Sequence, residues 1–232
     1  MSFVEQLTQA IIDIKPDISD EDLKKLISSF SVIIVQDYPQ REFTYIGNGS
    51  FKEAYLHSSV QGLVIKFIRP NEYIENEQAV YYKAQERGLG NFFVPSVWVD
   101  LPTSLTSEYL YDDDEDCYIY DDDEHDWVEN PDYEPLILTT LMLQPYILEA
   151  HNDFSIKIDD FKELNDEEKK RLEIMVDRTD CIWSWVLNAY NYYGKEELFK
   201  FFEFCEEYEV RDLRRPNLGY IGDKPVILDW LS

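Results

Sequence analysis

Basic residues are scarce in this sequence. Its 232 residues include 21 Lys and Arg against 48 Asp and Glu, which gives a formal net charge of -27 at pH 7. Phosphate contacts need clustered Lys and Arg, so this charge argues against binding nucleic acid or an anionic membrane through a basic surface. The charge is compatible with a basic protein partner, or with a nucleotide whose bound cation offsets the local acidity.

Cysteine, histidine and long apolar runs are also scarce. The three cysteines, Cys117, Cys181 and Cys205, have no CxxC spacing, which favours reduced thiols in a cytosolic protein over a disulfide or a zinc site. The three histidines are scattered, so no histidine-based metal site is expected. The sequence has no recognisable signal peptide and no stretch of about eighteen apolar residues, which predicts a cytoplasmic protein without a membrane span.

The sequence does contain enough apolar material for a core. Apolar residues make up 44% of the chain and aromatic residues 15%, so the chain as a whole is not expected to be disordered. Its length suits one domain of two lobes or two small domains.

The first 40 residues have a helical pattern. Residues 2–14 show the apolar spacing of an amphipathic helix that Pro16 ends, and Ser19 is a good N-cap for a second helix with acidic residues in its first turn. Residues 1–40 are therefore expected to form a helical cap before the main fold.

Short β-branched and aromatic runs follow the cap, broken by glycine-containing turns, and predict a strand-rich block. A helix over 74–88, ended by Gly88, separates the third strand from the fourth. The expected strands are residues 43–47, 53–58, 62–68, 92–100 and 135–147.

An acidic insert, residues 107–134, separates the last two of these strands. Fourteen acidic residues lie between Glu108 and Glu134, and no Lys or Arg occurs from Gly88 to Ile156. Like charges at this density repel each other and resist compaction. The insert is either a solvated loop without a partner or a protein-binding surface, and its CYIY stretch is either a hairpin strand or a short anchored segment.

After Pro145 the pattern turns helical. Residues 166–194 and 195–208 carry apolar side chains at three- and four-residue spacing, and Gly194 separates the two segments. Strands at 218–221 and 225–229, joined by the turn signal GDK, predict a closing hairpin whose second strand ends at Asp229.

Two glycines lie in GNGSFKEAY, between the first two expected strands. A glycine-rich turn lets backbone N–H groups approach phosphate oxygens without a Cβ in the way, here at Gly47 and Gly49. A plain hairpin turn explains the same two glycines. The motif is not a dinucleotide-binding fingerprint, because a strand rather than a helix follows it.

One lysine, Lys66, lies in the middle of the apolar strand LVIKF. It points either to solvent from an edge strand or into a cleft, where it would pair with phosphates and with an acid, because a buried ammonium without a partner is costly. The following helix offers Glu75 and Glu77. Glu77 is favoured, because Tyr81 four residues later places apolar bulk on the same helix face.

Polar residues with oxygen atoms gather in the tail RDLRRPNLGYIGDKPVILD. Asp212 and Asn217 are five residues apart, and Asp229 follows the last strand. Asn and Asp side chains at the mouth of a hairpin can coordinate a hard cation. Taken singly, each of the three residues is an ordinary turn residue.

The order of these features resembles the protein-kinase-like fold. GNGSFKEA looks like its glycine-rich loop, LVIK like its third strand, RDLRRPN like its catalytic loop and DWL like its DFG motif. The stretch IGNGSFKEAYLHS with VIKF is similar to the small early serine/threonine kinases of tailed bacteriophages. The resemblance spans residues 43–230. It implies an α+β bilobal fold, with an antiparallel-sheet N-lobe at 41–146 and a reduced, mostly helical C-lobe at 147–232.

The resemblance also implies a site for ATP and Mg²⁺ (or Mn²⁺). Lys66 would hold the α- and β-phosphates with Glu77 as its ion-pair partner, and Asn217 and Asp229 would bind the metal. The remaining nucleotide contacts would come from the glycine loop and a hinge that reads adenine through its backbone: Gly47, Asn48, Gly49, Ser50, Phe51, Met142, Leu143 and Gln144.

For catalysis, the resemblance implies that Asp212 accepts the substrate hydroxyl proton and that Arg214 takes the place of the catalytic-loop lysine near the γ-phosphate. The chain departs from the family at Val210, Lys52 and Leu231, where a histidine, the third loop glycine and the DFG glycine are usual. The sequence stops at Ser232, before the activation segment and the helices that follow it in that family.

Three functions fit these observations. The first is an ATP-dependent serine/threonine protein kinase of phage type that modifies host proteins in the bacterial cytoplasm, with the acidic insert steering basic substrates. The second is a kinase-like acidic protein that binds and inhibits a basic, nucleic-acid-binding host protein without needing catalysis. The third is a small-molecule kinase, which usually has a helical acceptor-binding subdomain after the residue matching Asp229.

Overall fold

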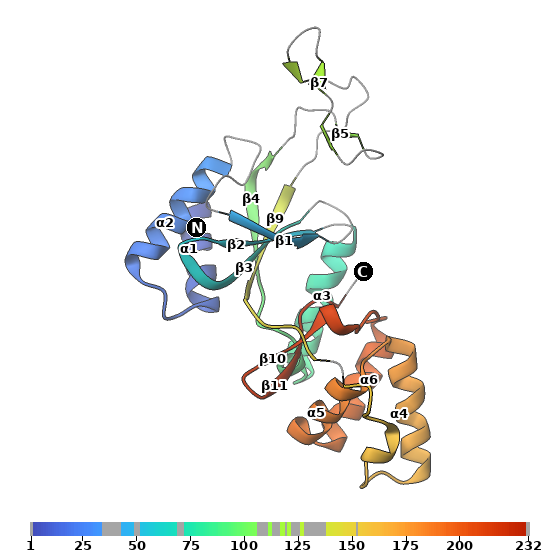
Figure 1. Cartoon of the computed structure of the whole chain (residues 1–232). Coiled ribbons are helices and arrows are strands. Elements are labelled where there is room, and N and C mark those ends of the chain that lie inside the picture. Colours follow the sequence, from blue (N-terminus) through green and yellow to red (C-terminus); the bar gives the residue numbers. More distant parts are fainter. Residues whose placement is uncertain are drawn as a thin grey trace. The chain divides into compact units, whose positions relative to one another are not determined.

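The fold is described from a computed structural model of the chain (Figure 1). It describes residues 2–33, 43–48, 52–68, 72–105, 138–151 and 153–230, with four two-residue strands at 111–112, 117–118, 120–121 and 126–127. For some of these residues the structure describes the backbone alone: 31–33, 48, 72–75, 101–105, 138–139 and the four short strands.

The chain divides into two compact units. The first unit comprises Met1–Gln61, Ile65–Pro70 and Trp98–Leu143, and the second comprises Gly62–Val64, Asn71–Val97 and Gln144–Ser232. Strands β3, β4 and β9 contribute residues to both units. The expected three-part division of the chain at residues 40 and 146 stays a prediction.

Two helices open the first unit, as the sequence predicts. Helix α1 (Phe3–Ile14) begins with a capping box between Ser2 and Glu5. Helix α2 (Asp20–Ile33) begins after Ser19, whose Oγ accepts a 3.1 Å hydrogen bond from the Asp22 backbone N–H. The two helices pack against each other and bury their apolar faces, with Leu7, Ile11, Leu26 and Phe30 at 2% exposure or less.

A five-stranded antiparallel sheet forms the rest of the first unit's framework. Its strand order is β1-β2-β3-β9-β4. The strands are β1 (Phe43–Asn48), β2 (Lys52–His57), β3 (Val60–Ile68), β4 (Val97–Leu105) and β9 (Leu138–Pro145). The pairing of β1 with β2 confirms the predicted hairpin around the glycine loop, and it contains a bulge between Tyr45 and Gly47.

Aromatic packing attaches helix α2 to this sheet. Phe30 lies edge-on to Phe43 at 5.8 Å, and Phe43 and Tyr55 both contact Phe67 edge-on. A buried hydrogen bond of 3.0 Å joins Ser29 Oγ and His57 Nε2. Helix α2 therefore shares the core of the first unit with the sheet.

The acidic insert contributes four short strands to the described residues. Strand β5 (Tyr111–Asp112) pairs with β6 (Cys117–Tyr118), and β7 (Tyr120–Asp121) pairs with β8 (Asp126–Trp127), both in antiparallel register. The CYIY stretch thus supplies strands to two successive hairpins, which confirms the hairpin alternative. The rest of residues 107–134 lies outside the described part.

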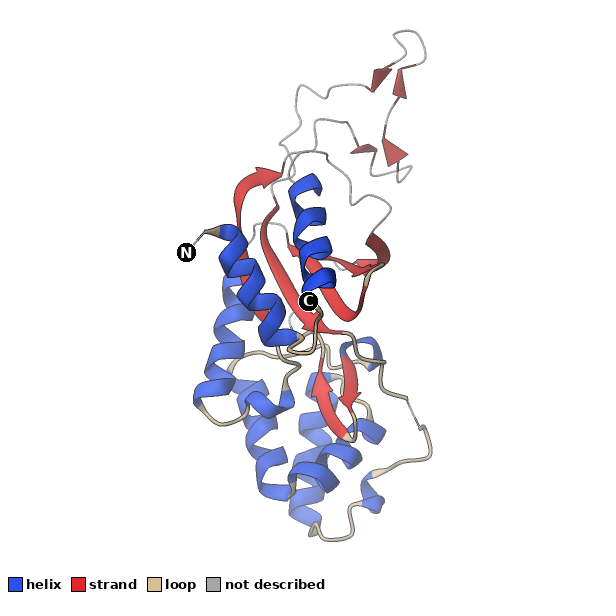
Figure 2. Ribbon diagram, turned by 90° about the vertical axis from the view of Figure 1, so that its left-hand side faces the viewer, coloured by secondary structure: helices blue, strands red, loops and turns tan. Residues whose placement is uncertain are grey.

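The second unit is mainly helical. Its helices are α3 (Glu72–Glu86), α4 (Asp166–Thr179), α5 (Trp183–Tyr193) and α6 (Lys195–Glu207), with short 3-10 turns η1 (Gly90–Phe92), η2 (Ile158–Asp160) and η3 (Arg215–Asn217). Strands β10 (Leu218–Ile221) and β11 (Lys224–Ile227) form the predicted hairpin, with Gly222 at φ +61° in its turn. The hairpin lies beside α5, and α5 and α4 both pack on α6 (Figures 1 and 2).

Three sequence-based boundaries are wrong. The strand expected at 92–100 begins at Val97, because the chain first forms η1 and then a parallel bridge between Phe93 and Ile227 that precedes Pro95. The helix expected over 166–194 is broken after Thr179, because Asp180 adopts a left-handed conformation (φ 55°) and caps α4. The last strand ends at Ile227, two residues before Asp229.

The core of the second unit is dominated by aromatic residues. Phe92 stacks on Phe201 at 4.4 Å, and Trp185 and Phe93 also contact Phe201. Two free cysteines, Cys181 and Cys205, are buried in this unit. None of the helices in the described residues is long and apolar enough to cross a membrane.

Candidate functional site

The predicted catalytic residue Asp212 lies in a turn between α6 and η3. Its backbone has φ +64°, a left-handed conformation that few non-glycine residues adopt. The following residue, Leu213, donates a 2.8 Å backbone hydrogen bond to the carbonyl of Thr179 at the end of α4. The Asp212 side chain is 13% exposed, so the carboxylate is held at a partly shielded position. Positive φ values at non-glycine residues concentrate at functional sites, where surrounding structure enforces them.

Asn217 holds this carboxylate from the other end of the motif. Its Nδ2 donates 2.8 Å to the Asp212 carbonyl oxygen and 3.1 Å to Asp212 Oδ2. Because one amide nitrogen binds both the backbone and the side chain of Asp212, the five-residue spacing closes into a compact loop. The amide oxygen of Asn217 is consequently directed away from the carboxylate.

Arg214 binds the second carboxylate oxygen of Asp212. Its Nε forms an ion pair with Asp212 Oδ1, and this hydrogen bond raises the pKa of the Arg214 guanidinium above its ordinary value. The Arg214 side chain is 64% exposed, so its charge can be redirected to another anion at little desolvation cost. In the described arrangement, both oxygens of Asp212 accept hydrogen bonds, one from Asn217 and one from Arg214.

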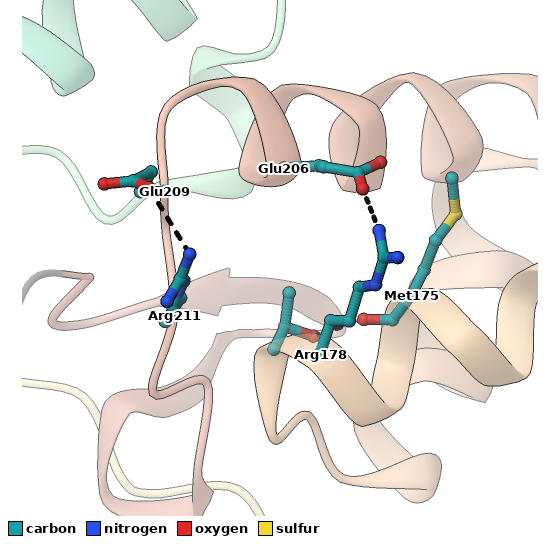
Figure 3. Close-up of polar contacts among 6 residues, drawn as sticks. Met175, Arg178, Glu206, Glu209 and Arg211 are labelled. Carbon is teal, nitrogen blue, oxygen red and sulfur yellow. Dashed lines mark hydrogen bonds and ion pairs between the residues drawn. The ribbon is translucent and has the colours of Figure 1, made fainter.

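Two exposed ion pairs lie near the segment that leads into this turn. Arg178 of α4 pairs with Glu206 of α6, and Arg211 pairs with Glu209 at 3.4 Å (Figure 3). Both pairs are more than half exposed and contribute little to stability. The hydrogen bond from Thr179 Oγ1 to the Met175 carbonyl is buried and strengthens the end of α4, to which Leu213 is bound.

Asp229 is brought next to Asn217 by the hairpin. The backbone N–H of Leu228 donates a 2.8 Å hydrogen bond to the carbonyl of Asn217, one residue before Asp229. Strands β10 and β11 pair from Leu218 to Ile227, so they carry Asn217 and Asp229 at their adjoining ends. The structure therefore brings the three polar residues of the tail together.

A buried network holds the residues on either side of Asp229. Gln144 is 3% exposed, and its Nε2 donates 3.2 Å to the carbonyl of Leu228 and 2.9 Å to Ser96 Oγ. The Ser96 N–H in turn donates 3.2 Å to Tyr81 Oη. On the other side of Asp229, Trp230 stacks on the Tyr81 ring at 5.7 Å. The residues before and after Asp229 are thus both held by side chains of the second unit.

Trp230 also reaches helix α3. Its Nε1 donates a 3.1 Å hydrogen bond to the carbonyl of Glu77, and the Trp230 side chain is 1% exposed. Phe93 packs edge-on against the same indole at 5.1 Å. The network of Gln144, Ser96, Tyr81 and Trp230 is called the tail clamp below. The spacing of these four residues along the sequence does not reveal them as a unit.

Lys66 and Glu77 are both buried, at 9% and 1% exposure. Lys66 lies in β3 and Glu77 in α3, as the sequence predicts. Burial of Lys66 disfavours the alternative that it lies on a solvent-facing edge strand. The ion pair between the two residues stays a prediction, since they belong to different units.

Much of the predicted glycine loop lies outside the described residues. Gly49, Ser50 and Phe51 are among those, and of Asn48 the backbone alone is described, at the end of β1. A Cβ at Gly47 would meet nothing within 4 Å, so local space does not require a glycine at that position. The β1–β2 hairpin itself is present on both sides of the loop.

The predicted hinge crosses the boundary between the units. Met142 and Leu143 are fully buried and belong to the first unit, whereas Gln144 belongs to the second. The chain passes between the units within this segment, as it does at several other places. The role assigned to the Gln144 backbone stays a prediction, and its side chain has the additional role in the tail clamp described above.

The donor set at the end of the hairpin fits a hard cation. Asn217 and Asp229 offer an amide oxygen and a carboxylate, and Mg²⁺ is usually held by one or two protein side chains together with water and phosphate oxygens. The orientation of the Asn217 amide leaves its oxygen available for this role. Within the described residues, no three or more His, Cys, Asp and Glu side chains cluster as an all-protein metal site.

No protein-family model matches the chain, and the search of curated proteins found no similar sequence.

Proposed function

We propose that this chain is an ATP-dependent phosphotransferase with a kinase-like fold, and that its substrates are serine or threonine hydroxyls of proteins. The observation that carries the proposal is the joining of Asp212, Asn217 and the segment of Asp229 into one hydrogen-bonded site. A D-x-x-x-x-N loop followed by a hairpin and an Asp is the arrangement that phosphoryl transfer uses in kinases. The resemblance to small phage kinases supports the serine/threonine class.

In the proposed reaction, the substrate hydroxyl oxygen forms a bond to the γ-phosphorus of ATP. The bond between that phosphorus and the β–γ bridging oxygen breaks, and ADP leaves with the electron pair. Asp212 accepts the hydroxyl proton, which requires that Arg214 release Oδ1. Arg214 would then face the phosphoryl oxygens, whose negative charge it can balance.

Asn217 and Asp229 would hold Mg²⁺, which would neutralise charge on the phosphates. Lys66 would contact the α- and β-phosphates and Glu77 would orient Lys66. Asn217 would have two tasks in this scheme, because its Nδ2 donates to Asp212 and its amide oxygen would be left to bind the metal. Its replacement is expected to impair both functions together.

The test is transfer of labelled γ-phosphate to host-cell proteins and to the chain itself, with Mg²⁺ or Mn²⁺. Asp212→Asn and Asp229→Ala are expected to lower transfer by about two to four orders of magnitude, as loss of a proton acceptor or of electrostatic stabilisation does. Asp177→Asn is the matched control, since Asp177 is an exposed acid on α4 of the same unit. Absence of both transfer and metal-dependent nucleotide binding in the unmodified chain would exclude the proposal.

A second candidate is favoured by the charge distribution. A chain of net charge -27 without any Lys or Arg from Gly88 to Ile156 has the electrostatic character of a protein that occupies a basic, nucleic-acid-binding surface. In that case Asp212→Asn would leave the biological effect intact, and replacement of the acids in 112–126 by Asn and Gln would abolish it. The opposite result supports the phosphotransferase.

A further inference from the structure

An open groove of about 620 Å³ lies between α5, the turn of the β10–β11 hairpin and residues Leu148 and Glu149. All of these residues belong to the second unit. The name docking groove is used for it below. The turn at Gly222 and Asp223 forms one wall, and Asn191 and Tyr192 of α5 form another. The groove does not include Asp212, Asn217 or Asp229, so the proposed reaction gives it no role.

Apolar side chains are left uncovered in this groove. Leu148 is 72% exposed and Tyr192 is 53% exposed, and both line the same hollow. A single exposed leucine is ordinary on a protein surface, but large apolar side chains gathered in a concave site are typical of binding surfaces. Tyr220 adds a second aromatic ring to the lining.

The walls of the groove are fixed by hydrogen bonds. Ala150 N–H donates 2.7 Å to the Leu218 carbonyl, and Asn188 Nδ2 donates 2.8 Å to Tyr220 Oη. Gly219 allows the segment around Leu148 to lie directly on β10, because a Cβ there would come within 2.8 Å of the Leu148 carbonyl oxygen. A groove fixed before its ligand arrives loses little conformational freedom on binding.

The polar lining selects for positive charge. Glu149 and Asp223 line the groove. Its other polar groups are two carboxamides and two tyrosine hydroxyls, with no Lys or Arg among the lining residues. Glu149 shares its charge with Arg215 at 3.6 Å, so Asp223 is the stronger attraction for a cation. An acidic groove with an apolar floor complements a peptide that carries both basic and apolar side chains.

We propose that the docking groove binds an extended segment of the protein substrate. An apolar side chain of that segment would cover Leu148 and Tyr192, and a nearby Lys or Arg would approach Asp223. Asn191 can donate to and accept from a peptide backbone. The inference rests on the proposed function in one respect, that the bound protein is also the phosphate acceptor. The groove would hold the substrate at a surface separate from the reacting atoms and raise its local concentration.

The experiment selects peptides from a phage-displayed library of random dodecamers on the intact chain, without nucleotide. Selected peptides are then labelled with fluorescein and their affinity is measured by anisotropy. The expected peptides combine Lys or Arg with Leu, Ile, Val or Phe, and their affinity falls as salt is raised. Because no nucleotide is present, peptide binding is measured independently of phosphate transfer. Failure of the docking groove can therefore be distinguished from failure of the proposed function.

Variants locate the binding. Leu148→Ala and Asp223→Lys are each expected to weaken peptide binding at least about tenfold. Phe154→Ala and Asp177→Lys are the matched controls, because Phe154 is 86% exposed and neither residue lines the groove. Phosphate transfer to a protein substrate should fall with Leu148→Ala while ATP hydrolysis or autophosphorylation is unchanged.

Three outcomes would overturn the inference. One is that no peptide is enriched, and another is that the enriched peptides bind the groove variants as well as the unmodified chain. The third is that the chain is dimeric in solution and Leu148→Ala makes it monomeric, in which case a second copy covers the groove. Because Leu148 is exposed, Leu148→Ala is expected to fold normally, so weaker binding by this variant would not result from misfolding. Circular dichroism checks that the variant is folded.

Discussion

The indole Nε1 of Trp230 donates a 3.1 Å hydrogen bond to the backbone carbonyl of Glu77. These residues are 153 positions apart in the sequence, yet both belong to the surroundings of the proposed site. Trp230 directly follows the proposed metal ligand Asp229, and Glu77 is the proposed partner of Lys66. A shift of α3 along its axis would therefore break this bond or carry the Asp229 segment with it.

Replacing Trp230 tests this coupling. Trp230→Phe keeps a ring against Tyr81 but removes the N–H donor, so the free energy of unfolding should fall by about 1 kcal/mol. Trp230→Ala also leaves a cavity and should cost about 3–5 kcal/mol. Urea unfolding measures both. If Trp230→Phe is as stable as the unmodified chain and binds Mg²⁺–ATP equally well, the hydrogen bond has no part in placing Asp229.

The buried amide of Gln144 gives a second prediction. Gln144→Leu leaves the Leu228 carbonyl without its donor, which should cost about 1–3 kcal/mol of stability. Gln144→Glu places a carboxylate against that carbonyl at neutral pH. Burial should raise the pKa of this new carboxyl, so the variant should become more stable as the pH falls and the carboxyl regains a proton to donate.

The control for this pH dependence is Gln61→Glu, at an exposed position of β3. Thermal melts of both variants between pH 5 and 8 give the comparison. If Gln144→Glu does not become more stable relative to Gln61→Glu as the pH falls, the amide N–H of Gln144 is dispensable.

Local patterns predicted most of the elements because they depend on neighbouring residues. The cap at Ser19, the β1–β2 hairpin and the GDK turn each follow from chemistry within a few positions. The break at Asp180 escaped prediction because a single aspartate adopts the left-handed conformation inside a segment that keeps helical apolar spacing on both sides. Aspartate is among the few residues that tolerate this conformation, but spacing alone does not reveal it.

In the candidate site, too, local relationships could be predicted from the sequence and long-range ones could not. The spacing of Asp212 and Asn217 was visible in the sequence, and their hydrogen bonds close that spacing. The side-chain role of Gln144 was not visible, because its partner Leu228 is 84 residues away. A polar residue in the otherwise apolar strand LMLQ was the available signal, since a buried amide requires partners.

Arg214 provides a prediction about catalysis. In the described arrangement its Nε pairs with Asp212 Oδ1, the oxygen that must be vacated for a substrate hydroxyl. If Arg214 moves to the phosphates, Arg214→Ala should weaken ATP binding and lower the transfer rate, while Arg214→Lys should recover part of both. Arg211→Ala is the matched control, because the Arg211 pair with Glu209 is exposed and lies on the same loop.

Steady-state kinetics with varied ATP separate the possibilities. A rise in KM for ATP together with a fall in kcat is expected for Arg214→Ala. A kcat that increases would mean that Arg214 only blocks Asp212, and equal effects of Arg211→Ala and Arg214→Ala would mean that neither guanidinium acts on the phosphates.

The buried thiols give a prediction for alkaline pH. Burial raises the pKa of Cys181 and of Cys205 above the ordinary value, so both stay protonated in the folded chain at a pH where the unfolded chain loses these protons. The folded state then binds more protons than the unfolded state, and the free energy of unfolding falls as the pH rises above about 8.5. Burial also raises the pKa of Tyr193, whose hydroxyl lies within hydrogen-bond distance of the carbonyls of Asn91 and Pro225. Tyr193 therefore adds to the loss of stability above about pH 10.

Urea unfolding at several pH values between 7 and 10 measures this dependence. The double variant Cys181→Ala with Cys205→Ala should be less stable at pH 7 because it loses buried volume, but its stability should decline less steeply above pH 8.5. Labelling of Cys181 and Cys205 by iodoacetamide should require unfolding at every pH in this range, since both side chains are at most 7% exposed. Removal of the two thiols removes the protons linked to them, whatever the change in packing. If stability declines with pH equally steeply in the double variant and the unmodified chain, other groups cause the alkaline loss of stability.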